Sequence, residues 1–152
     1  MSGAANDPLD LRTRCEREIY GLHVFFERWF TGDLPGEKDV FARLSSALAD
    51  DFRYILPAGR LLQRTEVLDG LFKAHGARRE ARIEIRNLLF PAAPEGELAL
   101  VFFEEHQWLD GAYDPRYNTA LMRRKPAAPE GVEWLHLHET MQARTETHPR
   151  KS

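Results

Sequence analysis

Two histidines alternate with leucines near the end of the chain, at His136 and His138, and a third histidine, His106, precedes them. Imidazole titrates near neutral pH, so a histidine that faces a cavity is suited to proton transfer or to holding a polar ligand. Histidines one residue apart on a strand are also spaced for metal ligation, with His106 or Glu104 as a third ligand. Such residues more often serve as hydrogen-bonded parts of a sheet or subunit interface. A structural role is therefore favoured first and a polar pocket second, and no metal is expected.

The strand predicted over Val132–Met141 decides which way the two final histidines point. Side chains alternate along a strand, so one face would hold the indole and both imidazoles: Trp134, His136 and His138. If the preceding hairpin turns symmetrically, cross-strand neighbours lie about 5 Å apart at Cβ and Asn118 faces His138. Met122 then faces Trp134.

The hairpin before that one would extend the row of polar side chains. A turn about Ala112 places His106 beside Asn118. A slip of one residue would turn the neighbouring side chains to this face instead, namely Glu105 and Gln107. The candidate catalytic residues are His106 and His138. The expected ligand-binding residues are Tyr54, Trp108, Asn118, Trp134, His136 and His138.

Composition indicates an ordinary globular domain. The chain has 152 residues, 43% of them hydrophobic and 30% charged, which suits one domain with a substantial core. The formal net charge is -3 with both signs interleaved, so neither a nucleic acid nor a membrane is an expected partner. The single cysteine, Cys15, excludes an internal disulfide framework. No signal peptide or membrane span is evident, and a cytoplasmic location is expected.

Hydrophobic periodicity predicts helices first and strands afterwards. Apolar residues at steps of three and four, with a glycine or proline at the ends, predict three helices: 9–30, 37–48, and one from an N-cap at Thr65 to Gly76. Alternation predicts strands over 52–56, 60–63, 81–90, 97–109, 116–124 and 132–141. This order predicts an α+β domain over residues 9–143, with three helices packed on a curved, mainly antiparallel sheet around a pocket. Residues 1–8 and 144–152 are expected to be disordered.

Four segments, in this order along the chain, resemble the nuclear-transport-factor-2-like (NTF2-like) superfamily, and within it the SnoaL-like and ketosteroid-isomerase-related domains of unknown function. The segments are the aromatic first helix, Ala49–Gly59, Arg64–Leu68 and Val132–Thr140. The closing His-x-His-x-Thr also resembles the strand that ends the association domain of calcium/calmodulin-dependent kinase. The resemblance implies a cone-shaped, cystatin-like fold with a pocket between helices and sheet, and commonly a dimer through the outer face of the sheet.

The resemblance does not imply one chemistry, because the superfamily includes isomerases, dehydratases, cyclases, epoxide hydrolases and domains with no known catalysis. Leu56 stands where ketosteroid isomerases have their catalytic aspartate, so that mechanism does not carry over. The Asp-Arg-Asp set of the epoxide hydrolases is not evident either, because Asp114 and Arg116, although near each other, sit at a predicted turn that contains Pro115.

Three functions remain open. The first is a small-molecule-binding domain with a mostly apolar pocket, expected to be homodimeric and to use no cofactor. The second is an enzyme of the lyase, isomerase or cyclase kind that acts on a small hydrophobic substrate, with His106 or His138 as general base. The third is a non-catalytic dimerisation module.

Overall fold

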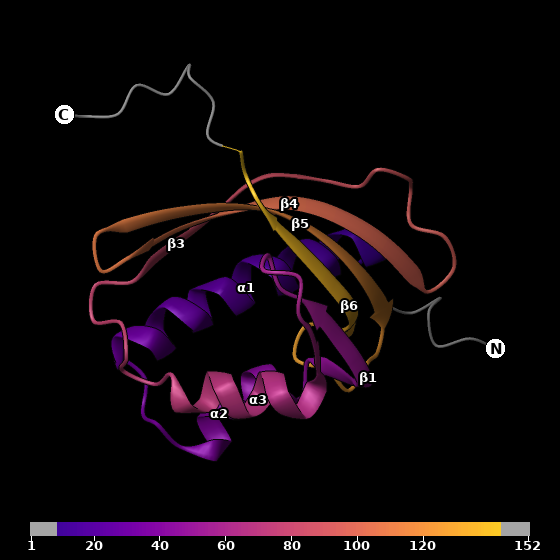
Figure 1. Ribbon diagram of the computed structural model, residues 1–152. Coiled ribbons are helices and arrows are strands. Elements are labelled where there is room, and N and C mark those ends of the chain that lie inside the picture. The colour runs from indigo at the N-terminus through magenta and orange to yellow at the C-terminus, as the bar shows by residue number, and fades with distance from the viewer. Residues whose placement is uncertain (1–8, 144–152) are drawn as a thin grey trace.

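The computed structural model describes residues 9–143, in which three helices lie against one face of a six-stranded sheet (Figure 1). The helices are α1 (Leu11–Thr31), α2 (Lys38–Ser45) and α3 (Arg64–Lys73). The strands are β1 (Leu48–Ile55), β2 (Leu61–Gln63), β3 (Arg82–Leu89), β4 (Leu98–Leu109), β5 (Ala112–Arg124) and β6 (Val132–Met141). The predicted α+β class is confirmed. Residues 1–8 and 144–152, for which the sequence predicts disorder, lie outside the described residues.

The strand order β2-β1-β6-β5-β4-β3 puts the last strand of the chain in the middle of the sheet. All neighbouring strands are antiparallel except β1 and β6, which run parallel. Figure 1 shows β4 and β5 arching over α1, with α2 and α3 below. Side chains on the inner face of β4, β5 and β6 therefore point toward the helices. No helix within residues 9–143 has the length and apolar character needed to span a membrane.

Helix α1 has 21 residues and packs a buried stripe against the sheet. Its N-cap Asp10 accepts a hydrogen bond from the backbone N–H of Thr13 at 2.8 Å, and Gly32 ends it in the left-handed region at φ +81°. Its buried stripe continues into the core, where it meets Phe103, Met122 and Trp134. The predicted helix over residues 9–30 is thus confirmed, with ends shifted by a residue or two.

Two predicted boundaries in the first half are wrong. The second helix ends at Ser45, and β1 begins at Leu48 and continues through Asp50 and Asp51. Tertiary pairing decides this, because the backbone N–H of Trp134 donates to the Ala47 carbonyl at 2.8 Å. The N-cap of α3 is Gln63 rather than Thr65, and it forms a reciprocal capping box with Glu66.

The β4–β5 hairpin turns earlier than predicted. Asp110 and Gly111 have φ of 50° and 89°, which is the two-residue turn that an Asp-Gly pair favours. Leu109 therefore pairs with Ala112, and β5 includes the segment predicted as a turn. As a result His106 pairs with Pro115, and its predicted place beside Asn118 is wrong.

A β-bulge at Leu135 changes which side chains of β6 face inward. Met122 pairs with Trp134, as predicted, but the next pair is Leu121 with His136. The extra residue reverses the alternation that follows it, so the inner face receives Leu137 and Glu139 in place of the two histidines. Asn118 consequently pairs with Glu139, and the predicted row His106–Asn118–His138 is wrong.

Candidate functional site

A cavity of about 520 Å³ lies between the helices and the inner face of the sheet. Most of its lining is apolar and comes from all three helices and from β1, including Leu22, Phe26, Phe30, Leu44, Phe52, Val67 and Leu71. The volume is within the range of sites that enclose small organic molecules. The cavity therefore suits a mainly hydrophobic ligand.

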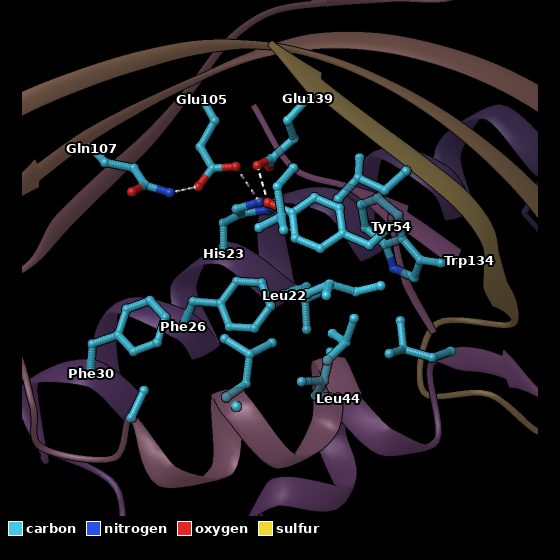
Figure 2. Close-up of a pocket in the computed structure, with 18 of the residues that line it drawn as sticks. Leu22, His23, Phe26, Phe30, Leu44, Tyr54, Glu105, Gln107, Trp134 and Glu139 are labelled. Atoms are coloured by element: carbon cyan, nitrogen blue, oxygen red, sulfur yellow. Dashed lines mark hydrogen bonds and ion pairs between the residues drawn. The ribbon is translucent and has the colours of Figure 1, made fainter. Parts of the chain in front are cut away.

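One end of the cavity is polar. Figure 2 shows Glu105 and Gln107 of β4 and Glu139 of β6 extending from the sheet toward the helices, where they meet His23 of α1 and Tyr54 of β1. These five residues lie on four different elements. The curvature of the sheet over α1 brings them together.

His23 and Glu105 form a buried pair at this end. The Nδ1 atom of His23 lies 2.7 Å from the Ile19 carbonyl, which can only accept, so this nitrogen carries a proton. The Nε2 atom then faces Oε1 of Glu105 at 3.2 Å, with both side chains about 5% exposed. Gln107 donates to the other Glu105 oxygen. The arrangement fits an imidazolium beside a carboxylate.

Glu139 is held by a second set of partners. The Tyr54 hydroxyl donates to Oε1 of Glu139, and Nη1 of Arg116 donates to the same atom at 2.7 Å. The rest of the Arg116 guanidinium binds Asp114, with Nη2 2.8 Å from Oδ2. Arg116 thus bridges two carboxylates. The sequence prediction missed this set because it placed residues 110–115 in a turn, whereas β5 begins at Ala112.

The two buried glutamates have opposite pKa shifts. Burial and the negative charge of Glu105 raise the pKa of Glu139 to about 7, although Arg116 and Tyr54 oppose this. Burial alone would raise the pKa of Glu105 too, but the charge and hydrogen bond of His23 lower it instead. The same pairing raises the pKa of His23 against the effect of burial. Near neutral pH, Glu105 is therefore ionised while Glu139 exchanges a proton.

The geometry of Glu139 also selects the oxygen that exchanges this proton. Tyr54 and Arg116 both donate to Oε1. The proton of a neutral Glu139 is therefore expected on Oε2, where it can pass to or from a bound molecule. Burial and the neighbouring Glu139 raise the pKa of Tyr54, so its hydroxyl remains a donor.

Only two of the predicted site residues, Tyr54 and Trp134, line this cavity. His106 lies on the outer face of β4, with Nδ1 2.6 Å from the Tyr113 hydroxyl and Nε2 2.9 Å from Glu104. Trp108 lies on the same outer face, where the Cζ atom of Arg82 stacks over its ring at 4.3 Å from the ring centroid.

The other three predicted site residues also lie outside the cavity lining. His138 is exposed, and His136 contributes to a separate surface hollow beside Asp50 and Arg53. Asn118 is fully buried on the inner face, and neither of its polar side-chain atoms has a hydrogen-bond partner. Within residues 9–143, no group of three or more His, Cys, Asp or Glu side chains is arranged to hold a metal ion.

Sequence reasoning missed His23 and the inward direction of Glu139. His23 had a detectable signal, because it follows Ile19 by four residues and precedes Phe26 by three, which places a polar side chain on the apolar stripe of α1. Glu105 and Gln107 appeared only as the outcome of a one-residue slip, whereas the observed register is shifted by three residues, so that His106 pairs with Pro115 rather than Asn118. An odd shift of either size turns Glu105 and Gln107 to the inner face.

The family model described as "Sucrose-6-phosphate phosphohydrolase C-terminal" matches residues 15–143. The chain belongs to this family. No curated protein matches the sequence. The match spans the helices and the strands that build the cavity, so the site described above is part of the family domain.

Solved structures show the same NTF2-like fold. An NTF2-like protein of unknown function from Pseudomonas aeruginosa is 27% identical, with a TM-score of 0.77 over 86% of this chain and 99% of that chain. A candidate dehydratase of the NTF2-like family from Streptomyces avermitilis is 19% identical, with a TM-score of 0.62 over 89% and 100%. A candidate calcium/calmodulin-dependent kinase II association domain from Exiguobacterium sibiricum is 16% identical, with a TM-score of 0.57 over 91% and 98%. The predicted NTF2-like resemblance is confirmed.

Proposed function

We propose that this domain binds a small, mostly hydrophobic molecule in the cavity and acts on it as an acid–base enzyme of the lyase or isomerase class. The observation that carries the proposal is Glu139, a buried carboxyl group at the polar end of an apolar cavity with a pKa raised to about 7. A general acid or base works best when its pKa lies near the operating pH. Glu139 therefore replaces the predicted histidines as the candidate proton-transfer residue.

The neighbours of Glu139 have separate roles in this proposal. Tyr54 and Arg116 fix the carboxyl group through Oε1 and leave Oε2 for proton exchange. Glu105 stays ionised beside His23, and its charge keeps the pKa of Glu139 high. Two carboxyl groups whose environments push their pKa values apart are a recurrent basis for acid–base catalysis.

The cavity also bears on the class of substrate. Its walls are aliphatic and aromatic, and its polar end holds two glutamates, so a doubly charged sugar phosphate would meet both apolar walls and like charge. The phosphohydrolase named in the family description is therefore a poor guide to what this cavity binds. A hydrophobic molecule with one polar group is the better fit, and the dehydratase name of one structural neighbour is consistent with lyase chemistry.

A test that needs no knowledge of the natural substrate uses nitrobenzisoxazole. Its ring opens to a coloured nitrophenolate when a base removes the ring-carbon proton and the N–O bond breaks, a reaction favoured in an apolar pocket. We expect ring opening whose rate rises with pH through about 7 and falls about 100-fold in the Glu139→Gln variant. The matched variant Glu104→Gln, on the outer face of the same sheet, should keep the full rate. Ring opening that is absent, or equal in both variants, would contradict the proposal.

Self-association is a second candidate function, favoured by the outer face of the sheet. Large apolar side chains of β4 and β5 are more than 40% exposed there, including Leu98, Leu100 and Tyr117. Tyr117 also contacts the ring of Phe102 at a centroid distance of 5.8 Å. Structural neighbours named as kinase association and hub domains support an interface role for this fold.

Light scattering tests this second function. We expect the mass of a homodimer for the unmodified chain and of a monomer for Leu100→Glu, because a buried unpaired charge is strongly unfavourable at an interface. Val24→Glu, at an exposed position on α1, is the matched control and should remain dimeric. A monomer mass for the unmodified chain would overturn the dimer.

A further inference from the structure

We propose that the molecule bound in the cavity carries an amino group, held as an ammonium ion by the carboxylate of Glu139. This ligand class rests on the proposed function in one respect, since it places the ligand in the same cavity. The ionised form of Glu139 is the form that acts as a base and also the form that pairs with a cation.

The polar end of the cavity holds more acidic than basic side chains. Two cationic side chains, His23 and Arg116, face three carboxylates there: Glu105, Asp114 and Glu139. With all five groups ionised, this end carries one negative charge in excess, next to apolar walls. A buried unpaired charge is costly, so it is neutralised by a proton or by a cation.

Both cationic side chains at this end, His23 and Arg116, already bind other groups of the protein. His23 is committed to Glu105 through Nε2 and to the Ile19 carbonyl through Nδ1. Arg116 divides its donors between Asp114 and a single oxygen of Glu139. The Oε2 atom of Glu139 therefore remains for a donor that the ligand supplies, and an ammonium group supplies both the hydrogen bond and the missing positive charge.

Several of the side chains that line the cavity are aromatic. Phe26, Phe30, Tyr54 and Trp134 line the cavity, and aromatic faces attract cations as well as hydrocarbon chains. Arg78, also in the lining, is ion-paired with Asp110 at 3.2 Å, so its charge is largely balanced. An anionic ligand would add to the excess negative charge, and a neutral ligand would leave Glu139 to bind a proton.

A matched set of three probes separates these ligand classes: cyclohexylmethylamine, cyclohexylmethanol and cyclohexanecarboxylate. At about pH 8 we expect calorimetry to show the amine binding about tenfold more tightly than the alcohol, and the carboxylate not binding. Below the pKa of Glu139, amine affinity should fall roughly tenfold per pH unit, because the proton competes with the ammonium ion. An alcohol that binds as tightly as the amine, or an amine affinity independent of pH, would overturn the proposal.

The Glu139→Gln variant should lose the preference for the amine and keep its affinity for the alcohol, while Glu104→Gln should bind like the unmodified protein. If Glu139→Gln does not fold, the pH dependence in the unmodified protein still decides. Failure of this inference differs from failure of the proposed function. Preferred alcohol binding with Glu139-dependent ring opening removes only the amine, whereas preferred amine binding without ring opening removes only the catalysis.

Discussion

Strand β4 contributes Glu105 to a glutamate–histidine pair at the cavity and Glu104 to another pair on the outer surface of the sheet. Glu105 pairs with His23 of α1 at 3.2 Å on the inner face, and Glu104 pairs with His106 at 2.9 Å on the outer face. The outer carboxylate also accepts hydrogen bonds from Asn87 and Gln142. The two glutamates are adjacent in the sequence and have the same chemistry.

Their surroundings make the difference. Burial raises the pKa of Glu104, but hydrogen bonds from Asn87, His106 and Gln142 together lower it, and Glu104 does not line the 520 Å³ cavity. Glu105 lies beside a second buried carboxyl group, and burial together with the charge of Glu105 raises the pKa of that group, Glu139, to about 7. The reactive character of the site therefore comes from packing between sheet and helices rather than from residue type.

Removing the histidine of each pair should give the largest contrast. His23→Leu leaves Glu105 buried without its cation, and we expect a loss of about 3–5 kcal/mol in the free energy of unfolding. His106→Leu leaves Glu104 with two other donors and access to water, so about 1 kcal/mol is expected. Urea unfolding of both variants measures this. Equal losses would show that the two pairs do not differ in burial as described.

Stability should also depend on pH through the inner face. The pKa of Glu139 is raised from an ordinary 4.5 to about 7, so its contribution is present below about pH 4.5 and is lost as pH rises through about 7. The free energy of unfolding should therefore fall by roughly 3 kcal/mol across this window. The lowered pKa of Glu105 acts in the opposite direction and only below about pH 4.5.

The Glu139→Gln variant should flatten this pH dependence, and Glu104→Gln should leave it unchanged. Thermal unfolding in a series of buffers measures the slope. A stability that rises between about pH 4.5 and pH 7 in the unmodified protein would have the wrong sign for a buried Glu139.

The smallest expected effect separates the tyrosines of the two faces. The hydrogen bond from Tyr54 lowers the pKa of Glu139, so Tyr54→Phe should move the midpoint of the rate profile to higher pH and cost about 1 kcal/mol of stability. Tyr113→Phe removes the corresponding hydroxyl from His106 on the outer face and should leave the profile in place. Rate profiles that shift equally would argue that neither tyrosine acts through Glu139.

The sequence predicts much of this fold because local patterns and tertiary packing agree there. The stripe of α1 and the strands after residue 81 follow from periodicity, and the NTF2-like resemblance supplied their arrangement. The predicted register of β4 and β5 was wrong because it depends on where the connecting turn lies. Asp110 and Gly111 form a two-residue turn, an arrangement that an Asp-Gly pair favours, but the prediction assigned the pair to a longer turn.

The site was harder to predict than the fold. The bulge at Leu135 has no local signature, and it moves Glu139 inward and His138 outward. The meeting of His23 with Glu105 joins a helix and a strand far apart in the sequence, which periodicity does not determine. Two register changes, the bulge in β6 and the earlier β4–β5 turn, therefore exchanged the candidate groups while leaving the fold prediction intact.

A carbon-13 NMR titration of the glutamate side-chain carboxyl groups tests directly whether Glu139 exchanges a proton near neutral pH. We expect one carboxyl resonance to titrate with a midpoint near pH 7, and that titration to be absent from the Glu139→Gln variant. If every glutamate of the unmodified protein titrates near or below its ordinary value of about 4.5, Glu139 does not exchange a proton at neutral pH and cannot be the general base.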